Sequence, residues 1–190
     1  MIDNFKHKHT INITYAMKTK LFVLLFSILC FNCTRAMDVY NKVVVDNLTG
    51  SAILIGKVNL EAFAMPEFKD WYNKEYNEYT PNKEIIDKLK DSIDDIKISI
   101  FLGTWCPDSR REVPRFIRIL SEVNFDFNNL SIISLDRMKK SPGGEEIGLD
   151  IDYVPTMIFY NNGKEIGRII ESPSTTLESD MLKILKTTNK

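Results

Sequence analysis

The chain has 190 residues, of which 44% are hydrophobic and 27% are charged, with 8 Gly, 7 Pro and 3 Cys. These values fit one domain with a sizeable core and exclude a collagen-like, low-complexity or disulfide-dense scaffold. The net charge is −1, but residues 1–36 carry five basic side chains and one acidic one, which leaves 20 basic and 25 acidic side chains in residues 37–190. This acidic balance disfavours nucleic-acid binding, because affinity for phosphates depends on clustered Lys and Arg.

Residues 1–36 have the pattern of a leader segment. Lys18 and Lys20 precede an apolar run, Leu21–Phe31, which matches the charged and hydrophobic regions of a secretory signal. Eleven helical residues rise only about 16 Å, roughly half the hydrocarbon thickness of a bilayer, so the run is too short to span a membrane. We expect Met17 to be the true start of translation.

Two ways of processing this leader fit the sequence. Cleavage after Ala36 would release a soluble protein, whereas lipidation of Cys33 would anchor the protein to the membrane. We favour cleavage, because the residues before Cys33 fit a lipid-modification signal badly. Both alternatives predict a domain outside the cytoplasm, either periplasmic or secreted.

The cysteines and histidines limit the possible chemistry. Cys30 and Cys33 lie at the end of the apolar run, so we interpret them as leader residues rather than a redox pair. Without the leader, Cys106 is the only certain thiol, and His7 and His9 are both lost. A Cys–His dyad is then impossible and a zinc site would depend almost wholly on carboxylates, so we expect no metal and no cofactor.

Residues 37–94 are assigned to an N-terminal extension packed on the domain that follows. Alternating apolar runs and turn signals predict strands, and aromatic side chains at three-to-four spacing predict a helix with an aromatic face. We interpret that face as a packing surface; the alternative is a surface that binds a peptide or ligand. The expected elements are strands at Val43–Val45 and Ala52–Ile55, a helix within residues 68–79 that ends before Pro81, and a helix at Lys83–Ser92 capped by Asn82.

Residues 95–190 predict an α/β domain, a mixed sheet flanked by helices in two or three layers. Asn162 and Gly163 between two apolar runs predict a β-hairpin. The expected elements are strands at Ile96–Leu102, Leu130–Leu135, Thr156–Tyr160 and Glu165–Ile170, a helix that begins at Pro107, and a last helix that begins with a Thr175–Glu178 capping box.

Cys106 follows the first of these strands and precedes a helix. Free N–H groups and the dipole at a helix N-terminus favour the thiolate. Arg110 and Arg111 add positive charge, which Asp108 and Glu112 partly offset. The pattern predicts a reactive Cys106.

The sequence here resembles the thioredoxin family. The matching residues are Trp105, Cys106, Pro107 and Ser109, Pro114 within the helix, Val154, Pro155 and Thr156, and Gly163 in the hairpin. The likeness covers residues 95–188, and residues 103–116 also resemble a branch of secreted or lipoprotein thioredoxin-like proteins in bacteria. It implies a thioredoxin-like fold in which Pro155 is cis and faces Cys106, with Trp105, Pro107, Val154, Pro155 and Thr156 as substrate-binding residues.

Two positions depart from the family pattern. Ser109 stands in place of the second redox cysteine, and Ile100 stands in place of a buried acid. A mixed disulfide on Cys106 therefore has no internal thiol to resolve it, and the dithiol cycle cannot close.

Two functions remain open. The first is monothiol thiol–disulfide exchange or isomerisation, in which Cys106 attacks disulfide- or thiol-bearing exported proteins or low-molecular-weight thiols, and Ser109 donates a hydrogen bond to the thiolate. The second is a redox-inactive binding module for exported proteins, which uses Trp105, Pro155 and residues 37–94.

Overall fold

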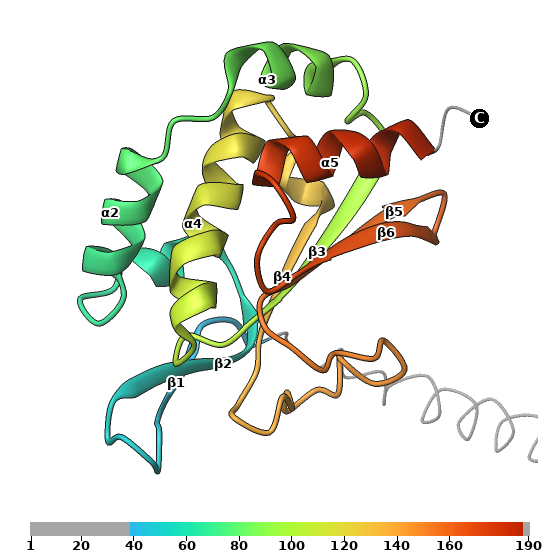
Figure 1. Cartoon of the computed structure of the whole chain (residues 1–190). Coiled ribbons are helices and arrows are strands. Elements are labelled where there is room, and N and C mark those ends of the chain that lie inside the picture. Colours follow the sequence, from blue (N-terminus) through green and yellow to red (C-terminus); the bar gives the residue numbers. More distant parts are fainter. Residues whose placement is uncertain (1–38, 188–190) are drawn as a thin grey trace, which may run out of the picture. The chain divides into compact units, whose positions relative to one another are not determined.

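The computed structural model describes residues 39–187, and these belong to one compact unit, Val39–Lys190. A six-stranded mixed sheet runs through this unit in the order β1-β2-β4-β3-β5-β6 (Figure 1). Only β3 and β4 are parallel, and every other pair of neighbours is antiparallel. The strands are β1 (Lys42–Val45), β2 (Ala52–Val58), β3 (Ile96–Leu102), β4 (Leu130–Ser134), β5 (Thr156–Asn161) and β6 (Lys164–Ile170).

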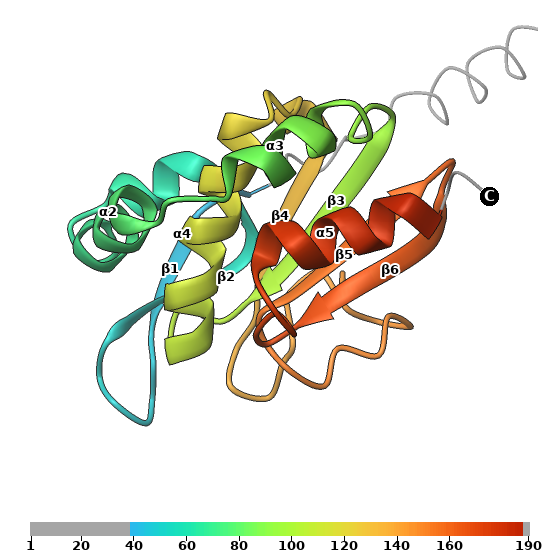
Figure 2. The same ribbon diagram turned by 45° about the horizontal axis from the view of Figure 1, so that its top comes forward.

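Four α-helices cover one face of the sheet (Figures 1 and 2). Helix α4 crosses the middle of that face with α2 beside it, and α3 and α5 pack against each other. The helices are α2 (Lys69–Glu78), α3 (Lys83–Lys90), α4 (Pro107–Glu122) and α5 (Leu177–Lys186), and two 3₁₀ turns, η1 (Leu60–Ala64) and η2 (Phe127–Asn129), join the elements.

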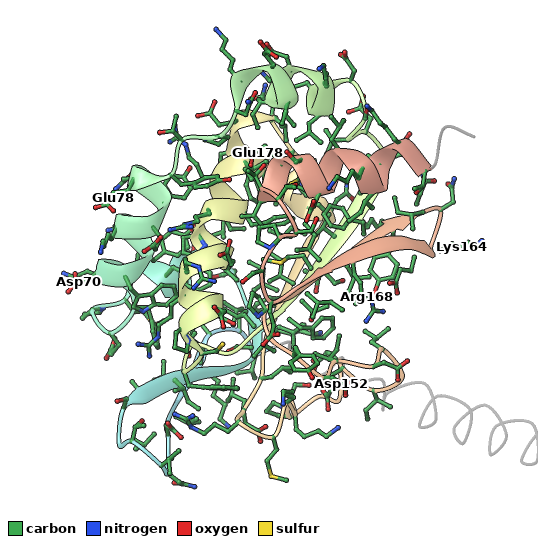
Figure 3. The ribbon with its side chains drawn as sticks, viewed as in Figure 1. Asp70, Glu78, Asp152, Lys164, Arg168 and Glu178 are labelled. Atoms are coloured by element: carbon green, nitrogen blue, oxygen red, sulfur yellow. The ribbon has the colours of Figure 1, made fainter. Side chains whose placement is uncertain are left out.

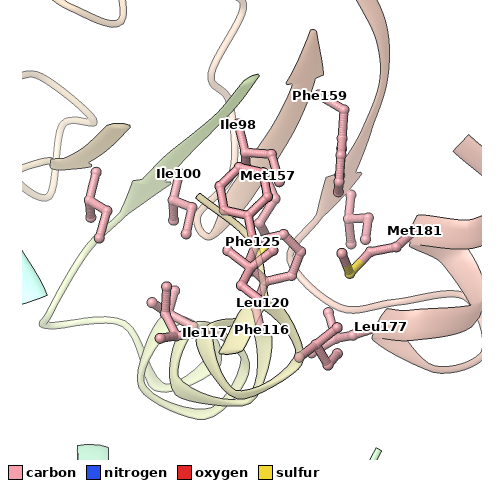
Figure 4. Close-up of a cluster of buried hydrophobic side chains, with 14 of the residues drawn as sticks. Ile98, Ile100, Phe116, Ile117, Leu120, Phe125, Met157, Phe159, Leu177 and Met181 are labelled. Carbon is pink, nitrogen blue, oxygen red and sulfur yellow. The ribbon is translucent and has the colours of Figure 1, made fainter. Parts of the chain in front are cut away.

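The main core lies between the sheet and the helices. Side chains alternate between the two faces of a strand, so Ile98 and Ile100 of β3 point toward the helices while Phe101 points to the other side. Figure 4 shows Ile98 and Ile100 of β3 in one cluster of buried side chains with Phe116 of α4 and Met181 of α5. Ile100, which stands where the thioredoxin family has a buried acid, is fully buried in this apolar core.

The opposite face of the sheet is covered by a long connection, residues 135–155, rather than by a helix. A smaller cluster lies beneath it and includes Phe101, Ile133 and Ile158 of the sheet and Ile151 of the connection. Among the described residues the fold therefore has two layers, with the connection closing the second face.

The strand order confirms the thioredoxin-like fold expected from the sequence. A β3-α4-β4 unit places its two parallel strands side by side, and an antiparallel β5–β6 hairpin followed by α5 completes the arrangement. The predicted hairpin is also confirmed, because Asn162 and Gly163 have φ values of 50° and 78°, the left-handed conformation that a tight two-residue turn needs.

Residues 39–94 contribute directly to the same sheet and core. Strand β2 pairs with β4, with Gly56 opposite Ser134. Leu54 of β2, Phe63 of η1 and Leu89 of α3 are each at most 1% exposed in the main core. The sheet thus continues across the boundary at residue 95 that we drew from the sequence.

The cap of the last helix differs from its prediction. Thr176, not Thr175, caps α5, because its Oγ1 accepts a hydrogen bond from the Ser179 N–H at 3.3 Å. Glu178 does not complete a capping box; its carboxylate accepts hydrogen bonds from the Tyr79 hydroxyl at 2.6 Å and from the Asn82 N–H at 3.0 Å. Figure 3 shows Glu178 at the start of α5, facing the segment that joins α2 to α3. The Glu178 side chain therefore binds partners distant in the sequence instead of the cap residue of its own helix.

No helix within residues 39–187 is long and apolar enough to cross a membrane. The expected leader, with Met17 and Cys33, lies outside the described residues.

Candidate functional site

Cys106 lies at the junction between β3 and α4. It is the N-cap residue of α4, with an extended backbone (φ −89°, ψ 127°), and Pro107 is the first residue of the helix. A proline suits this position because its missing N–H would have no partner inside the helix. The structure therefore places the Cys106 thiol at a helix N-terminus, as the sequence predicted.

The thiol faces the segment that precedes β5. Cys106 Sγ donates a hydrogen bond to the carbonyl oxygen of Val154 at 3.2 Å, and the Val154–Pro155 peptide bond is cis. Cys106 is 8% exposed and Val154 is 3% exposed, so both belong to the smaller apolar cluster. Two segments 48 residues apart, each singled out in the sequence, meet at this contact.

Ser109 is fully buried one turn into α4. Its Oγ accepts a hydrogen bond from the Gly103 N–H at 3.1 Å. The serine thus closes the turn between β3 and α4, and its contact with Gly103 differs from the hydrogen bond to Cys106 that the sequence suggested.

Trp105 packs beside Cys106 on the smaller cluster. Its indole N–H donates a hydrogen bond to the Leu135 carbonyl at 2.9 Å. Gly103 lies directly against the ring, because a Cβ at that position would be 2.6 Å from Trp105 Cε2. The ring therefore needs glycine at residue 103 in order to occupy this position.

The two arginines that follow the cysteine are held by different partners. Arg111 donates hydrogen bonds to Asp108 at 2.7 Å and to Glu112 at 2.6 Å, and the bond to Glu112 is the main cause of the raised pKa of its guanidinium. Arg110 binds the Thr104 carbonyl at 2.5 Å. Asp108 and Glu112 therefore offset Arg111, as the sequence indicated, and Arg110 keeps the positive charge nearest the turn.

The other predicted substrate-binding residues are Pro107, Pro155 and Thr156. Pro107 is exposed beside Cys106, and Pro155 is buried. Thr156 is 2% exposed, and its hydroxyl donates to the Tyr153 carbonyl at 2.7 Å, so it fixes the turn around Pro155. The structure thus brings Trp105, Cys106 and Val154 together and uses Ser109 and Thr156 to shape the two turns.

Sequence reasoning missed one side chain that contacts the site directly. The guanidinium carbon of Arg137 lies 5.1 Å from the centroid of the Trp105 ring. Arg137 lies at the start of the connection after β4, and no local pattern distinguishes it from other surface arginines.

Two large apolar side chains near these residues are exposed. Met138, next to Arg137, is 80% exposed, and Tyr153, next to Val154, is 54% exposed. Among residues 39–187, no group of three or more His, Cys, Asp or Glu side chains is arranged to hold a metal ion.

Comparisons with known proteins support the fold alone. No protein-family model matches the chain, and no curated protein matches its sequence. A protein of unknown function from Pseudomonas aeruginosa is similar in structure, with a TM-score of 0.54 at 12% identity over 70% of this chain and 94% of that one. A thioredoxin mutant from Halobacterium salinarum has a TM-score of 0.34 at 14% identity, over 58% of this chain and 88% of that one. Thioredoxin O2 from Arabidopsis thaliana has a TM-score of 0.35 at 18% identity, over 56% and 85%.

The class that the chain's own topology defines is the thioredoxin-like fold, and Cys106, the one cysteine within residues 39–187, lies at the start of α4. Two strands, β1 and β2, extend its sheet beyond β4.

Proposed function

We propose that the protein carries out monothiol thiol–disulfide exchange or isomerisation through Cys106. The observation that carries the proposal is the 3.2 Å contact between Cys106 Sγ and the Val154 carbonyl, which sets the thiol beside the backbone that precedes Pro155. The helix N-terminus behind Cys106 supplies N–H groups and a dipole that stabilise a thiolate.

The proposed reaction is an exchange with no net oxidation. The Cys106 thiolate attacks one sulfur of a substrate disulfide, a Cys106–substrate disulfide forms, and the second substrate sulfur leaves as a thiolate that takes up a proton from solvent. Ser109 lacks the sulfur needed to resolve this intermediate, so a second thiol, from the substrate or from a low-molecular-weight thiol, attacks the substrate sulfur and releases Cys106.

The Val154 carbonyl has two roles in this proposal. In the free protein it accepts a hydrogen bond from the Cys106 thiol at 3.2 Å. An extended substrate segment that pairs with the backbone before Pro155 would donate an N–H to the same carbonyl, as in strand addition. Substrate binding would then take the place of the thiol on this carbonyl and leave the sulfur free to react.

Trapping of mixed disulfides tests this proposal. We expect a chain that begins at Met37 to form a covalent adduct with a peptide disulfide, detected by intact mass, and Cys106→Ser to form none. Ser109→Ala should still form the adduct, because it leaves the nucleophile in place. An adduct that survives Cys106→Ser would contradict the proposal.

A redox-inactive binding module is the second candidate, and the burial of Cys106, at 8% exposed, favours it. In that case Trp105, Pro155 and the exposed Met138 and Tyr153 would hold a partner without covalent chemistry. Partner binding that is lost in Trp105→Ala and unchanged in Cys106→Ser would support the module and count against the exchange reaction.

The proposal includes a location outside the cytoplasm and exported proteins or low-molecular-weight thiols as partners. It rests on the leader pattern of Lys18, Lys20 and Leu21–Phe31, followed by release after Ala36 or an anchor at Cys33. Cell fractionation of the full chain tests it, and retention of an uncleaved, unmodified chain in the cytoplasm would contradict it.

A further inference from the structure

The turn between β1 and β2 reaches the Cys106 site through one buried carboxylate. Asp46, the residue after β1, is 5% exposed. It accepts hydrogen bonds from Arg137 Nε at 3.0 and 3.1 Å and from Arg137 Nη2 at 2.8 Å. These two residues are 91 positions apart, so the contact joins the first hairpin to the connection after β4.

Asp46 also organises its own turn. It accepts hydrogen bonds from the Thr49 hydroxyl at 2.7 Å and from the Leu48 N–H at 3.3 Å, and its carbonyl accepts from the Gly50 N–H at 2.7 Å. The hydrogen bonds from Arg137 and Thr49 lower the pKa of its carboxyl well below the ordinary value. The carboxylate therefore stays charged, and the pair stays intact, across the neutral range.

Arg137 links Asp46 to the Trp105 ring. Its guanidinium carbon is 5.1 Å from the centroid of the indole ring, while the indole N–H is bound to the Leu135 carbonyl and Gly103 lies against the ring. A guanidinium is planar and binds a carboxylate through two parallel N–H groups, so a carboxylate that holds both groups fixes the plane presented to an aromatic ring. Without Asp46, Arg137 would be a flexible side chain with many rotamers.

We propose that Asp46 and Arg137 are positioning residues that hold Trp105 in place beside Cys106. The first β-hairpin is then part of the site, although it lies outside the segment that resembles the thioredoxin family. The inference rests on the proposed function only in its effect on exchange, because the position of Trp105 can be measured without any reaction.

A fluorescence experiment tests the positioning directly. The chain has two tryptophans, and Trp71, whose indole N–H has no hydrogen-bond partner among the described residues, is replaced by Phe so that Trp105 is the only tryptophan and can be excited selectively. In this background, Asp46→Asn removes the charge but keeps an oxygen for the turn. We expect acrylamide to quench Trp105 about two- to fivefold more strongly, the range given by losing a contact of about 0.5–1 kcal/mol.

Matched variants separate positioning from general destabilisation. Glu75→Gln breaks the ion pair of Arg115 with Glu75, at 2.6 Å between α2 and α4, and should leave Trp105 quenching unchanged. Arg137→Lys keeps the positive charge and leaves Asp46 and its turn in place, so it serves as the second variant if Asp46→Asn does not fold. It should also raise quenching, because an ammonium does not present a flat face to the indole. Unchanged quenching in a folded Asp46→Asn or Arg137→Lys would overturn the inference.

The effect on chemistry is measured as two rates in the chain that begins at Met37. We expect Asp46→Asn to slow exchange with a peptide disulfide about two- to fivefold, and to change alkylation of Cys106 by iodoacetamide less than about twofold, because only the peptide contacts Trp105. Equal effects on both rates would overturn the inference. If the wild-type chain shows no exchange at all, the proposed function fails, and the quenching of Trp105 still decides whether Asp46 positions the ring.

Discussion

Gly103 is the residue on which the position of Trp105 depends most closely. A Cβ at residue 103 would lie 2.6 Å from Trp105 Cε2, closer than real Cβ contacts, so Gly103→Ala must displace the indole from the Leu135 carbonyl. We expect this substitution to lower the free energy of unfolding by about 1–3 kcal/mol. Urea unfolding measures the loss, and acrylamide quenching of Trp105 should rise in parallel.

Gly143→Ala is the control for this prediction. The three atoms nearest to a Cβ at residue 143 all belong to the carboxylate end of Glu145, which can rotate away by giving up its hydrogen bond from the Ser141 hydroxyl, so the change should cost at most about 1 kcal/mol. Equal losses in the two variants would mean that the contact between Gly103 and Trp105 has no special importance.

Ser109 decides which kind of exchange the site can perform. It lies one helical turn after Cys106, where a thiol could attack a mixed disulfide on that residue. Ser109→Cys should therefore raise the dithiothreitol-driven reduction of a protein disulfide about tenfold or more, and Ser109→Ala should give no gain. If Ser109→Cys reduces no faster than wild type, the missing thiol is not what limits the cycle.

The site was open to sequence analysis only where its residues follow one another closely in the chain. Pro107 after Cys106 predicts the start of a helix from the local sequence, and Val154 and Pro155 are identified through the resemblance to the thioredoxin family. Asp46 and Arg137 carry no such signal, because a surface turn and a surface loop become neighbours only when β2 pairs with β4.

At the scale of single elements, the start of α5 shows how a buried carboxylate sets acid stability. Burial raises the pKa of Asp180, but hydrogen bonds from Lys183, Ser174 and Thr175 outweigh it and lower the pKa from 3.8 to about 2. A depressed native pKa means that the stabilisation is present above pH 3.8 and is lost as the pH falls toward 2.

Asp180→Asn should therefore destabilise the protein by about 1–2 kcal/mol at pH 5 and by much less near pH 2. Urea unfolding at a series of pH values measures this difference. Asp152→Asn, at an exposed side chain, is the control (Figure 3). A gap between wild type and Asp180→Asn that stays constant across the range would contradict the assignment.

Helix α2 shows what periodicity predicts well. Its aromatic stripe was interpreted as a packing surface, and the structure confirms this: Tyr72 stacks on Phe63 at 4.7 Å between ring centroids, and the Tyr76 hydroxyl bonds Ser121 of α4 at 3.1 Å. Three-to-four spacing indicates which face of the helix packs against the core, although the aromatic side chains of α2 are only partly buried there. The role of Glu178 could not be read in the same way, because its partners, Tyr79 and Asn82, lie almost 100 residues away.

At the scale of the whole molecule, the first two strands are needed to complete the sheet. Strand β2 pairs with β4, the Leu54 N–H donates to Thr104 Oγ1 at 3.0 Å, and Ser134 Oγ donates to the Leu54 carbonyl at 2.8 Å. Removing residues 39–94 would expose one edge of β4 and much of the main core. A chain limited to residues 95–190 should therefore fail to fold, whereas residues 39–190 should unfold cooperatively.

Circular dichroism and urea unfolding of both chains check this prediction. A cooperative transition in residues 95–190 would show that the first two strands are an addition to a complete domain. The sequence indicated strands at Val43–Val45 and Ala52–Ile55, but not that the second of them pairs with β4. The choice between free sheet edges depends on packing against residues far along the chain.

The central claim is that the folded protein makes Cys106 a better nucleophile than an ordinary cysteine. The most direct test compares the rate of exchange between Cys106 and a neutral peptide disulfide at pH 7 in the folded chain from Met37 and in the same chain unfolded in urea. We predict that the folded chain reacts about tenfold faster, because the start of α4 stabilises the thiolate and the backbone before Pro155 binds the peptide. A folded chain that reacts more slowly than the unfolded one, at a rate set by its unfolding, would contradict the claim and leave the binding module.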